Sequence, residues 1–63
     1  MEENPPYVTV SSLRENEYFA SLMEWDARAG TYIATHVGIK QNTRVAAFMD
    51  AHELAHSRDC EVR

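Results

Sequence analysis

Residues 42–60 show the strongest helical periodicity in this chain and place the firmest constraint on its fold. The segment is NTRVAAFMDAHELAHSRDC, in which Asn42 is well suited to cap the start of a helix. At about 100° per residue, one face of that helix collects Val45, Phe48, Met49, His52, Ala55 and His56. The pattern predicts a helix with this stripe buried, so the rest of the chain must supply the surface that covers it.

The same segment contains His52-Glu53-Leu54-Ala55-His56, which has the HExxH spacing of zinc hydrolases. Two imidazoles one helical turn apart can bind one Zn²⁺, with the glutamate as general base on its bound water. Cys60 or His36 would have to supply a third ligand, and the chain is short for a peptidase scaffold. We therefore interpret the string as the end of the packing stripe. We expect no catalytic residue, cofactor or metal site, and leave adventitious metal binding open.

The chain has 63 residues and one cysteine, Cys60, so it cannot form an internal disulfide. A domain of this length buries only about 60% of its unfolded surface and usually needs additional support. A single thiol suits a reducing compartment, and no apolar run approaches the length of a membrane span. We expect a cytoplasmic protein, without membrane contact, that is supported by a partner subunit.

The first half of the chain predicts a short strand followed by one long helix. Residues 7–10 are β-branched or aromatic, and Ser12 with Glu15 forms a capping box. From residue 13 to 37, helical spacing places these apolar residues on one face: Tyr18, Phe19, Leu22, Met23, Trp25, Ala29, Ile33 and Val37. Gly30 costs such a helix about 1 kcal/mol relative to alanine. A helix that ends at Ala29, with a second one from Thr31, is the alternative.

Gly38 and Asp26 complete this interpretation. Gly38 is placed to adopt the left-handed conformation that ends a helix, with Ile39 making the accompanying hydrophobic contact. Asp26 interrupts the apolar face of the long helix, where a carboxylate needs a donor or water. Two roles stay open for it: pairing with a histidine or Arg44 of the second helix, or lying where the face opens to solvent.

The sequence therefore predicts a mainly α fold, in which one short N-terminal strand is followed by a long helix and a second helix in an intertwined homodimer. Residues 1–6 form a flexible tail, residues 7–58 a single strand-helix-helix dimerisation domain, and residues 59–63 a frayed tail. The apolar surface exceeds what a helical hairpin can cover, which favours self-association. The predicted dimer and partner interface comprises Val8, Val10, Tyr18, Phe19, Leu22, Met23, Trp25, Ile33, Val37, Val45, Phe48, Met49 and His52.

DNA binding is the second interpretation. Residues 33–43 are similar to the turn of a helix-turn-helix, with a small residue, a glycine and an aliphatic residue in order, although Arg44 stands where an apolar anchor belongs. The order strand, helix, helix also fits a ribbon-helix-helix dimer, although residues 7–10 offer no basic side chain to a groove. With 10 acidic and 6 basic residues, the formal net charge is −4. Nucleic acid is therefore possible but not favoured.

The layout also resembles a known family. The segments concerned are Tyr7-Val8-Thr9-Val10, Tyr18-Phe19-Ala20 through Trp25, Val37-Gly38-Ile39 and Val45-Ala46-Ala47-Phe48-Met49. In length and order, these resemble the small early-region proteins of lambdoid temperate phages that promote lytic development. The resemblance implies a small, non-enzymatic regulatory homodimer in the bacterial cytoplasm that binds a host or phage protein. It implies no catalytic residues.

Overall fold

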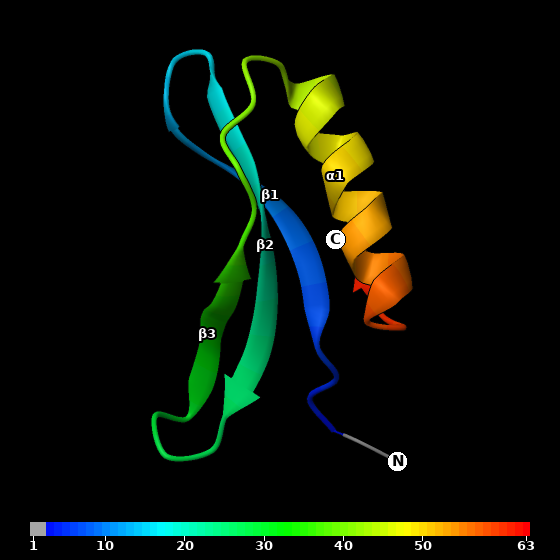
Figure 1. Ribbon diagram of the computed structural model, residues 1–63. Coiled ribbons are helices and arrows are strands. Elements are labelled where there is room, and N and C mark those ends of the chain that lie inside the picture. The colour runs from blue at the N-terminus through cyan, green and yellow to red at the C-terminus, as the bar shows by residue number, and fades with distance from the viewer. Residues whose placement is uncertain (1–2) are drawn as a thin grey trace.

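The computed structural model describes residues 3–63, which form a mixed sheet covered on one face by a helix (Figure 1). The elements are β1 (Tyr7–Arg14), β2 (Glu17–Asp26), β3 (Thr31–Val37), α1 (Arg44–Ser57) and β4 (Glu61–Val62). The strand order across the sheet is β3-β2-β1-β4. β1 and β3 each pair antiparallel to β2, and β4 pairs parallel to β1.

The prediction of a mainly α, intertwined strand-helix-helix fold is wrong, and so is the description of the chain as helical. Residues 13–37, predicted as one long helix, form the end of β1, all of β2 and all of β3. The physical reason lies in β2, which is apolar on both faces: Ala20 and Leu22 point to α1, and Phe19 and Met23 point away. A run that is apolar on both sides fits helical spacing as readily as strand spacing.

Two turns fold the three antiparallel strands back on one another. Asn16, between β1 and β2, has φ 63°, a left-handed conformation that asparagine tolerates. Gly30, between β2 and β3, has φ 68°, which glycine adopts without strain. Ser12, predicted to cap a helix, lies in β1 and its hydroxyl donates to the carbonyl oxygen of Arg14. Gly30, which interrupts the predicted helix, therefore lies in a turn between two strands.

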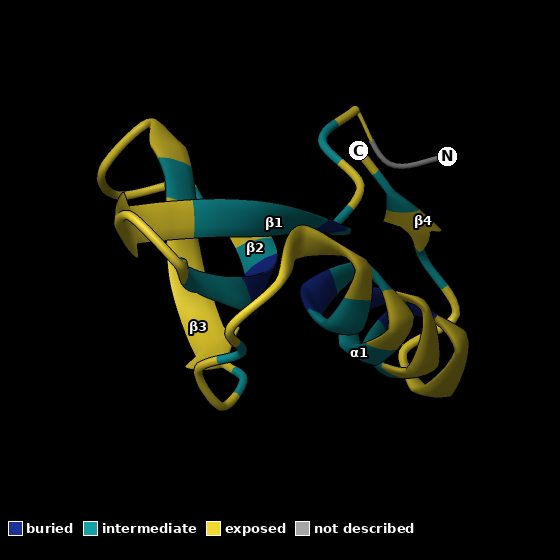
Figure 2. Cartoon of the chain, turned by 90° about the horizontal axis from the view of Figure 1, so that it is seen from above, coloured by how far each residue is buried: buried dark blue, intermediate teal, exposed yellow. Residues whose placement is uncertain are grey.

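The core lies between α1 and the middle of the sheet, as the buried residues in Figure 2 show. The helix contributes Ala47, Ala51 and Ala55, which recur every fourth residue and form a ridge of small side chains. The sheet contributes Val8, Ala20 and Leu22. Small side chains on the helix let its backbone approach the strands closely, so a 14-residue helix packs against β1, β2 and β4.

The helix begins one residue later than predicted. Thr43, rather than Asn42, is the N-cap, and its hydroxyl accepts a hydrogen bond of 3.2 Å from the Ala46 amide. After the helix, Asp59 takes φ 53° and turns the chain back toward the sheet. The Arg63 amide then donates to the Val8 carbonyl at 2.7 Å. The end of the chain, predicted to fray, thus adds β4 to the sheet edge.

At the other end, residues 1 and 2 of the predicted flexible tail lie outside the described residues. Within the described part of that tail, Pro5 accepts a hydrogen bond of 3.0 Å from the Tyr32 hydroxyl. Within residues 3–63, no helix has the length and apolar character needed to cross a membrane.

Candidate functional site

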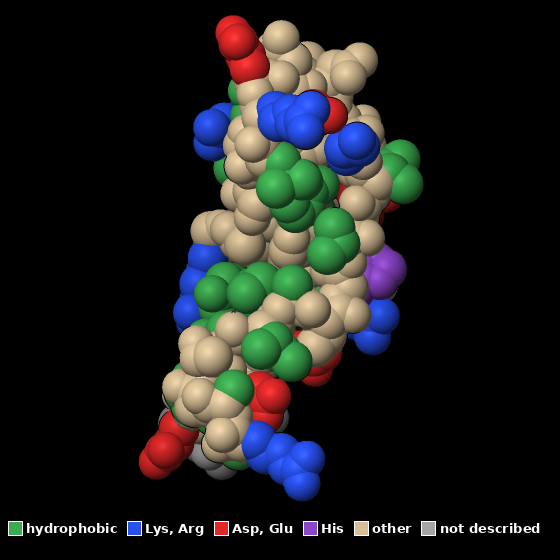
Figure 3. All heavy atoms as spheres, turned by 90° about the vertical axis from the view of Figure 1, so that its left-hand side faces the viewer, with side chains coloured by type: hydrophobic (Ala, Val, Ile, Leu, Met, Phe, Trp, Pro, Cys, Tyr) green, Lys and Arg blue, Asp and Glu red, His purple; other side chains and the backbone are tan. Residues whose placement is uncertain are grey.

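The face of the sheet opposite α1 is not covered by a helix, and it carries apolar side chains beside the hydroxyl residues Thr9, Ser11 and Ser21. Strand alternation places Val8, Ala20 and Leu22 toward α1, so their neighbours along the strands point to the other side. We call this surface the open face; its apolar members are Tyr7, Phe19, Met23, Trp25, Tyr32, Ala34 and Val37. Figure 3 views the molecule from the side opposite α1, and hydrophobic side chains gather across the middle of that side. Within residues 3–63, no helix or strand thus forms a second layer over this face of the sheet.

Three aromatic rings on the open face contact one another in edge-to-face geometry. Tyr32 lies between the other two, with centroid distances of 4.8 Å to Tyr7 and 5.3 Å to Trp25. These distances are within the favourable range for aromatic pairs. The hydrogen bond from the Tyr32 hydroxyl to Pro5 fixes the central ring. Trp25 remains 40% exposed, so the cluster is held in place while one large ring faces solvent.

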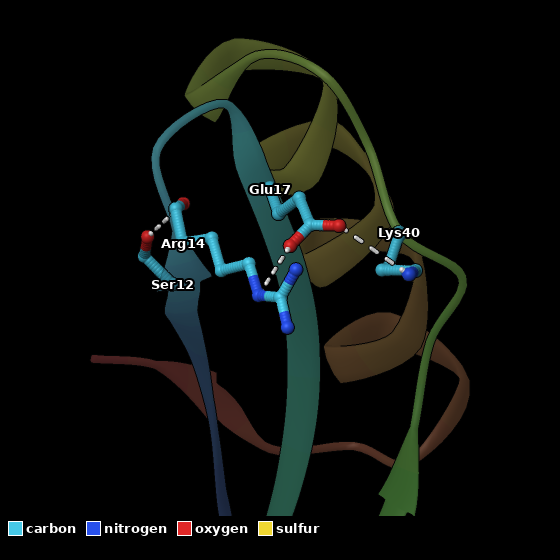
Figure 4. A network of polar contacts seen from close by, with 4 residues as sticks. All are labelled: Ser12, Arg14, Glu17 and Lys40. Atoms are coloured by element: carbon cyan, nitrogen blue, oxygen red, sulfur yellow. Dashed lines mark hydrogen bonds and ion pairs between the residues drawn. The ribbon is translucent and has the colours of Figure 1, made fainter.

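Charged side chains border the open face at the β1–β2 turn. The Glu17 carboxylate lies 3.4 Å from the Lys40 ammonium and 3.9 Å from the Arg14 guanidinium (Figure 4). These exposed pairs are each worth only about 0–1 kcal/mol and are screened by salt. Their effect is to neutralise charge locally, so the two basic side chains do not make this border strongly positive.

A second charged border lies at β4. Arg63 pairs with Glu61 at 2.7 Å, and its guanidinium carbon lies 4.5 Å from the centroid of the Tyr7 ring. The hydrogen bond to Glu61 raises the pKa of Arg63, so the guanidinium stays charged beside the ring. The open face therefore has an aromatic cluster at the end near the β2–β3 turn, and paired charges at the β1–β2 turn and beside Tyr7. That arrangement is typical of protein-binding surfaces.

The HExxH string lies on the opposite side of the molecule. His52, Glu53 and His56 are exposed on the outer surface of α1. Of the other members of the predicted stripe, Val45 and Met49 are exposed, Phe48 is half-buried and Ala55 is buried. Among residues 3–63, no three His, Cys, Asp or Glu side chains come close enough together to hold a metal ion. Cys60 is half-buried against the core and His36 lines a cleft beside β3. His52 and His56 thus have the spacing of a zinc motif, but within residues 3–63 no third ligand lies close to them.

The cleft beside His36 has a volume of about 460 Å³ and opens between residues 36–39 and α1. Gly38 lies close to α1 there, and a Cβ at this position would lie 2.5 Å from a carboxylate oxygen of Asp50, so that side chain would have to move. The φ of Gly38 is not positive, so the glycine does not adopt the predicted left-handed helix end. The hydroxyl of Ser57, which also lines the cleft, donates to the Leu54 carbonyl. The cleft contains no nucleophile paired with a base.

The predicted interface residues divide into three groups. Val8, Val10 and Leu22 pack with α1 inside the chain, and Tyr18 and Phe48 are half-buried. Phe19, Met23, Trp25 and Val37 lie on the open face, and Ile33 lies on β3. Val45, Met49 and His52 lie on the outer surface of α1.

Sequence reasoning missed Tyr7 and Tyr32 as members of the site. The signal was present as alternation in residues 31–37, TYIATHV, where β-branched and aromatic residues favour a strand over a helix. Once residues 31–37 are a strand, Tyr32 must lie beside Trp25, since the two are register partners in β2 and β3.

No family model matches the chain, and no curated protein and no solved structure matches it significantly. The residues that line the open face are therefore the basis for a functional proposal. The described residues contain one helix, so a helix-turn-helix pair is absent from that part of the chain. The resemblance to small phage proteins rested on the order strand, helix, helix and stays a prediction without that support.

Proposed function

We propose that the chain is a non-enzymatic protein-binding module that uses the open face to hold an apolar surface of a partner protein. The observation that supports this most is the cluster of Tyr7, Trp25 and Tyr32, in which Trp25 is 40% exposed, at one end of a sheet face that no helix or strand of residues 3–63 covers. Tryptophan and tyrosine contribute more binding energy at protein interfaces than most residue types.

Charge supports a protein partner over a nucleic acid. Single-stranded nucleic acids also stack on aromatic residues of sheets, but they require a positively charged groove along their backbone. Here Lys40 and Arg14 share Glu17, and Arg63 pairs with Glu61. The formal net charge of −4 further opposes binding to a polyanion.

The test compares three versions of the tagged chain as bait in extracts of its source cells. Trp25→Glu places a charge in the aromatic cluster of the open face. Met49→Glu is the matched control, because Met49 is also an exposed apolar residue, 67% exposed on the outer surface of α1. The circular dichroism of all three baits should agree.

The expected result is a protein retained by the wild type and by Met49→Glu and lost with Trp25→Glu. Retention that is indifferent to Trp25→Glu would contradict the proposal. Retention of nucleic acid that falls steeply with salt would favour the other class of ligand.

A further inference from the structure

The strand β3 lies at the edge of the sheet and is covered less than any other long strand. Its only neighbour is β2, and α1 packs against β1, β2 and β4 but not against β3. Of its seven residues, only Tyr32 is half-buried and the others are exposed. Figure 1 shows nothing beyond it on that side of the described chain. The outer backbone groups of β3 therefore have no strand partner within residues 3–63.

Protein edges of this kind are normally blunted by lysine, proline, a covering loop or a bulge. The sequence of β3, TYIATHV, contains no Lys, Arg, Asp, Glu or Pro. Its register with β2 shifts once, because Met23 pairs with Ala34 while Leu22 pairs with His36. The regular part, residues 31–34, lies before that shift, and Ile33 within it is 42% exposed. This half of the edge is open to another strand.

We propose that the occupant of this edge is a second copy of the chain, paired antiparallel through β3 about a two-fold axis at Ile33. This register places Ile33 against the same residue of the partner and Tyr32 against Ala34, all within the regular part of β3. Both are favourable cross-strand combinations: an aliphatic pair, and a large ring beside a small side chain. The outermost pair, Thr31 against Thr35, reaches the residue that the register shift leaves without a partner in β2. No pair brings like charges together, so the strand complements itself.

The small size of the core also favours a second copy of the chain at the β3 edge. Among residues 3–63, six hydrophobic residues are buried. Five of them are no larger than valine, namely Val8, Ala20, Ala47, Ala51 and Ala55, and the sixth is Leu22. A domain with so small a core gains stability when a partner subunit adds contacts. In an antiparallel pair of this register, both helices lie on one side of the joined sheet. The two open faces then form one continuous surface, twice as large, on the other side.

This dimer differs from an intertwined helical dimer because neither helix contributes to the contact. It is also independent of the proposed partner protein, since self-association is measured on the purified chain alone. A failure of one proposal therefore leaves the other in place.

The first test is analytical ultracentrifugation of the purified chain over a wide concentration range. We expect a reversible monomer–dimer equilibrium for the wild type. Ile33→Lys places two charges directly opposite each other, so its dissociation constant should rise roughly tenfold or more. Met49→Lys adds the same charge on the outer surface of α1 and should leave the equilibrium unchanged. A wild type that remains monomeric at every concentration overturns the proposal.

The second test locates the axis. In the proposed register, the Cα atoms of residue 33 in the two copies lie about 5 Å apart, a separation that a disulfide can span. Ile33→Cys should cross-link under mild oxidation. The wild type, which retains Cys60, and Ala29→Cys, in the exposed β2–β3 turn, should not. Equal cross-linking of Ile33→Cys and Ala29→Cys would mean random collision and would overturn the proposed register.

Discussion

At the scale of single residues, Asp26 fits poorly in the predicted helix but has a clear role in the observed sheet. In a helix from residue 13 to 37 it would be a carboxylate on the apolar face. In the structure it ends β2, and its Oδ1 atom accepts hydrogen bonds from the amides of Arg28 at 2.9 Å and Ala29 at 3.4 Å. Its carbonyl accepts from the Gly30 amide. Neither of the roles left open by the sequence applies, because Asp26 shapes the β2–β3 turn.

Asp26→Ala should lower the free energy of unfolding by about 1 kcal/mol, since two turn amides lose their acceptor. Asp26→Asn retains an acceptor oxygen at the same position and serves as the control. Urea denaturation followed by circular dichroism measures both. Equal stability of the alanine variant and the wild type would show that the turn does not depend on this side chain.

Cys60 provides a prediction about pH. Burial raises the pKa of its thiol, and the neighbouring carboxylates of Asp59 and Glu61 raise it further. The thiolate is the reactive form, so the folded chain should react with iodoacetamide more slowly at pH 8 than the urea-unfolded chain. Alkylation rates across pH 7–10 measure the difference. If the alkylation rate of the folded chain showed its inflection below the ordinary thiol pKa, the predicted upward shift of the Cys60 pKa would be wrong.

The sign of the linked stability effect follows from the direction of the shift. The protonated thiol is favoured in the folded state, and unfolding restores the ordinary pKa. The contribution of Cys60 to stability is therefore present below that ordinary pKa and is lost as the pH rises above it.

At the scale of elements, α1 forms where a helix was expected but buries a different face. The sequence pattern favoured the stripe that begins at Val45 and Met49, which are 71% and 67% exposed. The buried face is instead the ridge of Ala47, Ala51 and Ala55. Alanine is a small and weakly hydrophobic side chain. A helical pattern that is judged by its large apolar residues therefore overlooks a row of alanines that lets the helix pack close to a sheet.

Ala51→Leu distinguishes these two orientations. Ala51 has no exposed surface and packs with Val8, Ala20 and Leu22, so the larger side chain should destabilise the chain by about 1–3 kcal/mol. His52→Leu, one residue further along on the exposed side, should change stability by less than about 0.5 kcal/mol. Thermal unfolding of both variants measures this, and the reverse order would place the buried face on the histidine side.

The strands illustrate a different limit of sequence reasoning. The short strand expected at residues 7–10 is the first half of β1. The sequence provided it no partner, because its partners in β2 and β4 are set by contacts distant in sequence. A helix is recognised from local spacing alone, whereas a strand is stabilised by pairing that no local window contains. The sequence of β2 is therefore compatible with a helix and with a strand, and only its pairing with β1 and β3 decides between them.

At the scale of the whole molecule, the sequence indicated more apolar surface than a helical hairpin can cover, and Trp25, Val45 and Met49 are among the large hydrophobic side chains exposed in the structure. The predicted explanation was a helical dimer interface. The structure divides that surface between a small core, an open aromatic face and an unpaired edge. Which apolar residues share a surface depends on strand register, so Tyr7 and Tyr32 joined Trp25 only once the sheet was known.

The central claim, that the sheet presents its aromatic face to solvent, is tested most directly by collisional quenching of Trp25, the only tryptophan. The ring is 40% exposed, and pairing through β3 leaves the open face uncovered. Acrylamide should therefore quench its fluorescence efficiently at low and high protein concentration alike. A protected tryptophan with strongly blue-shifted emission in the free chain would contradict the account.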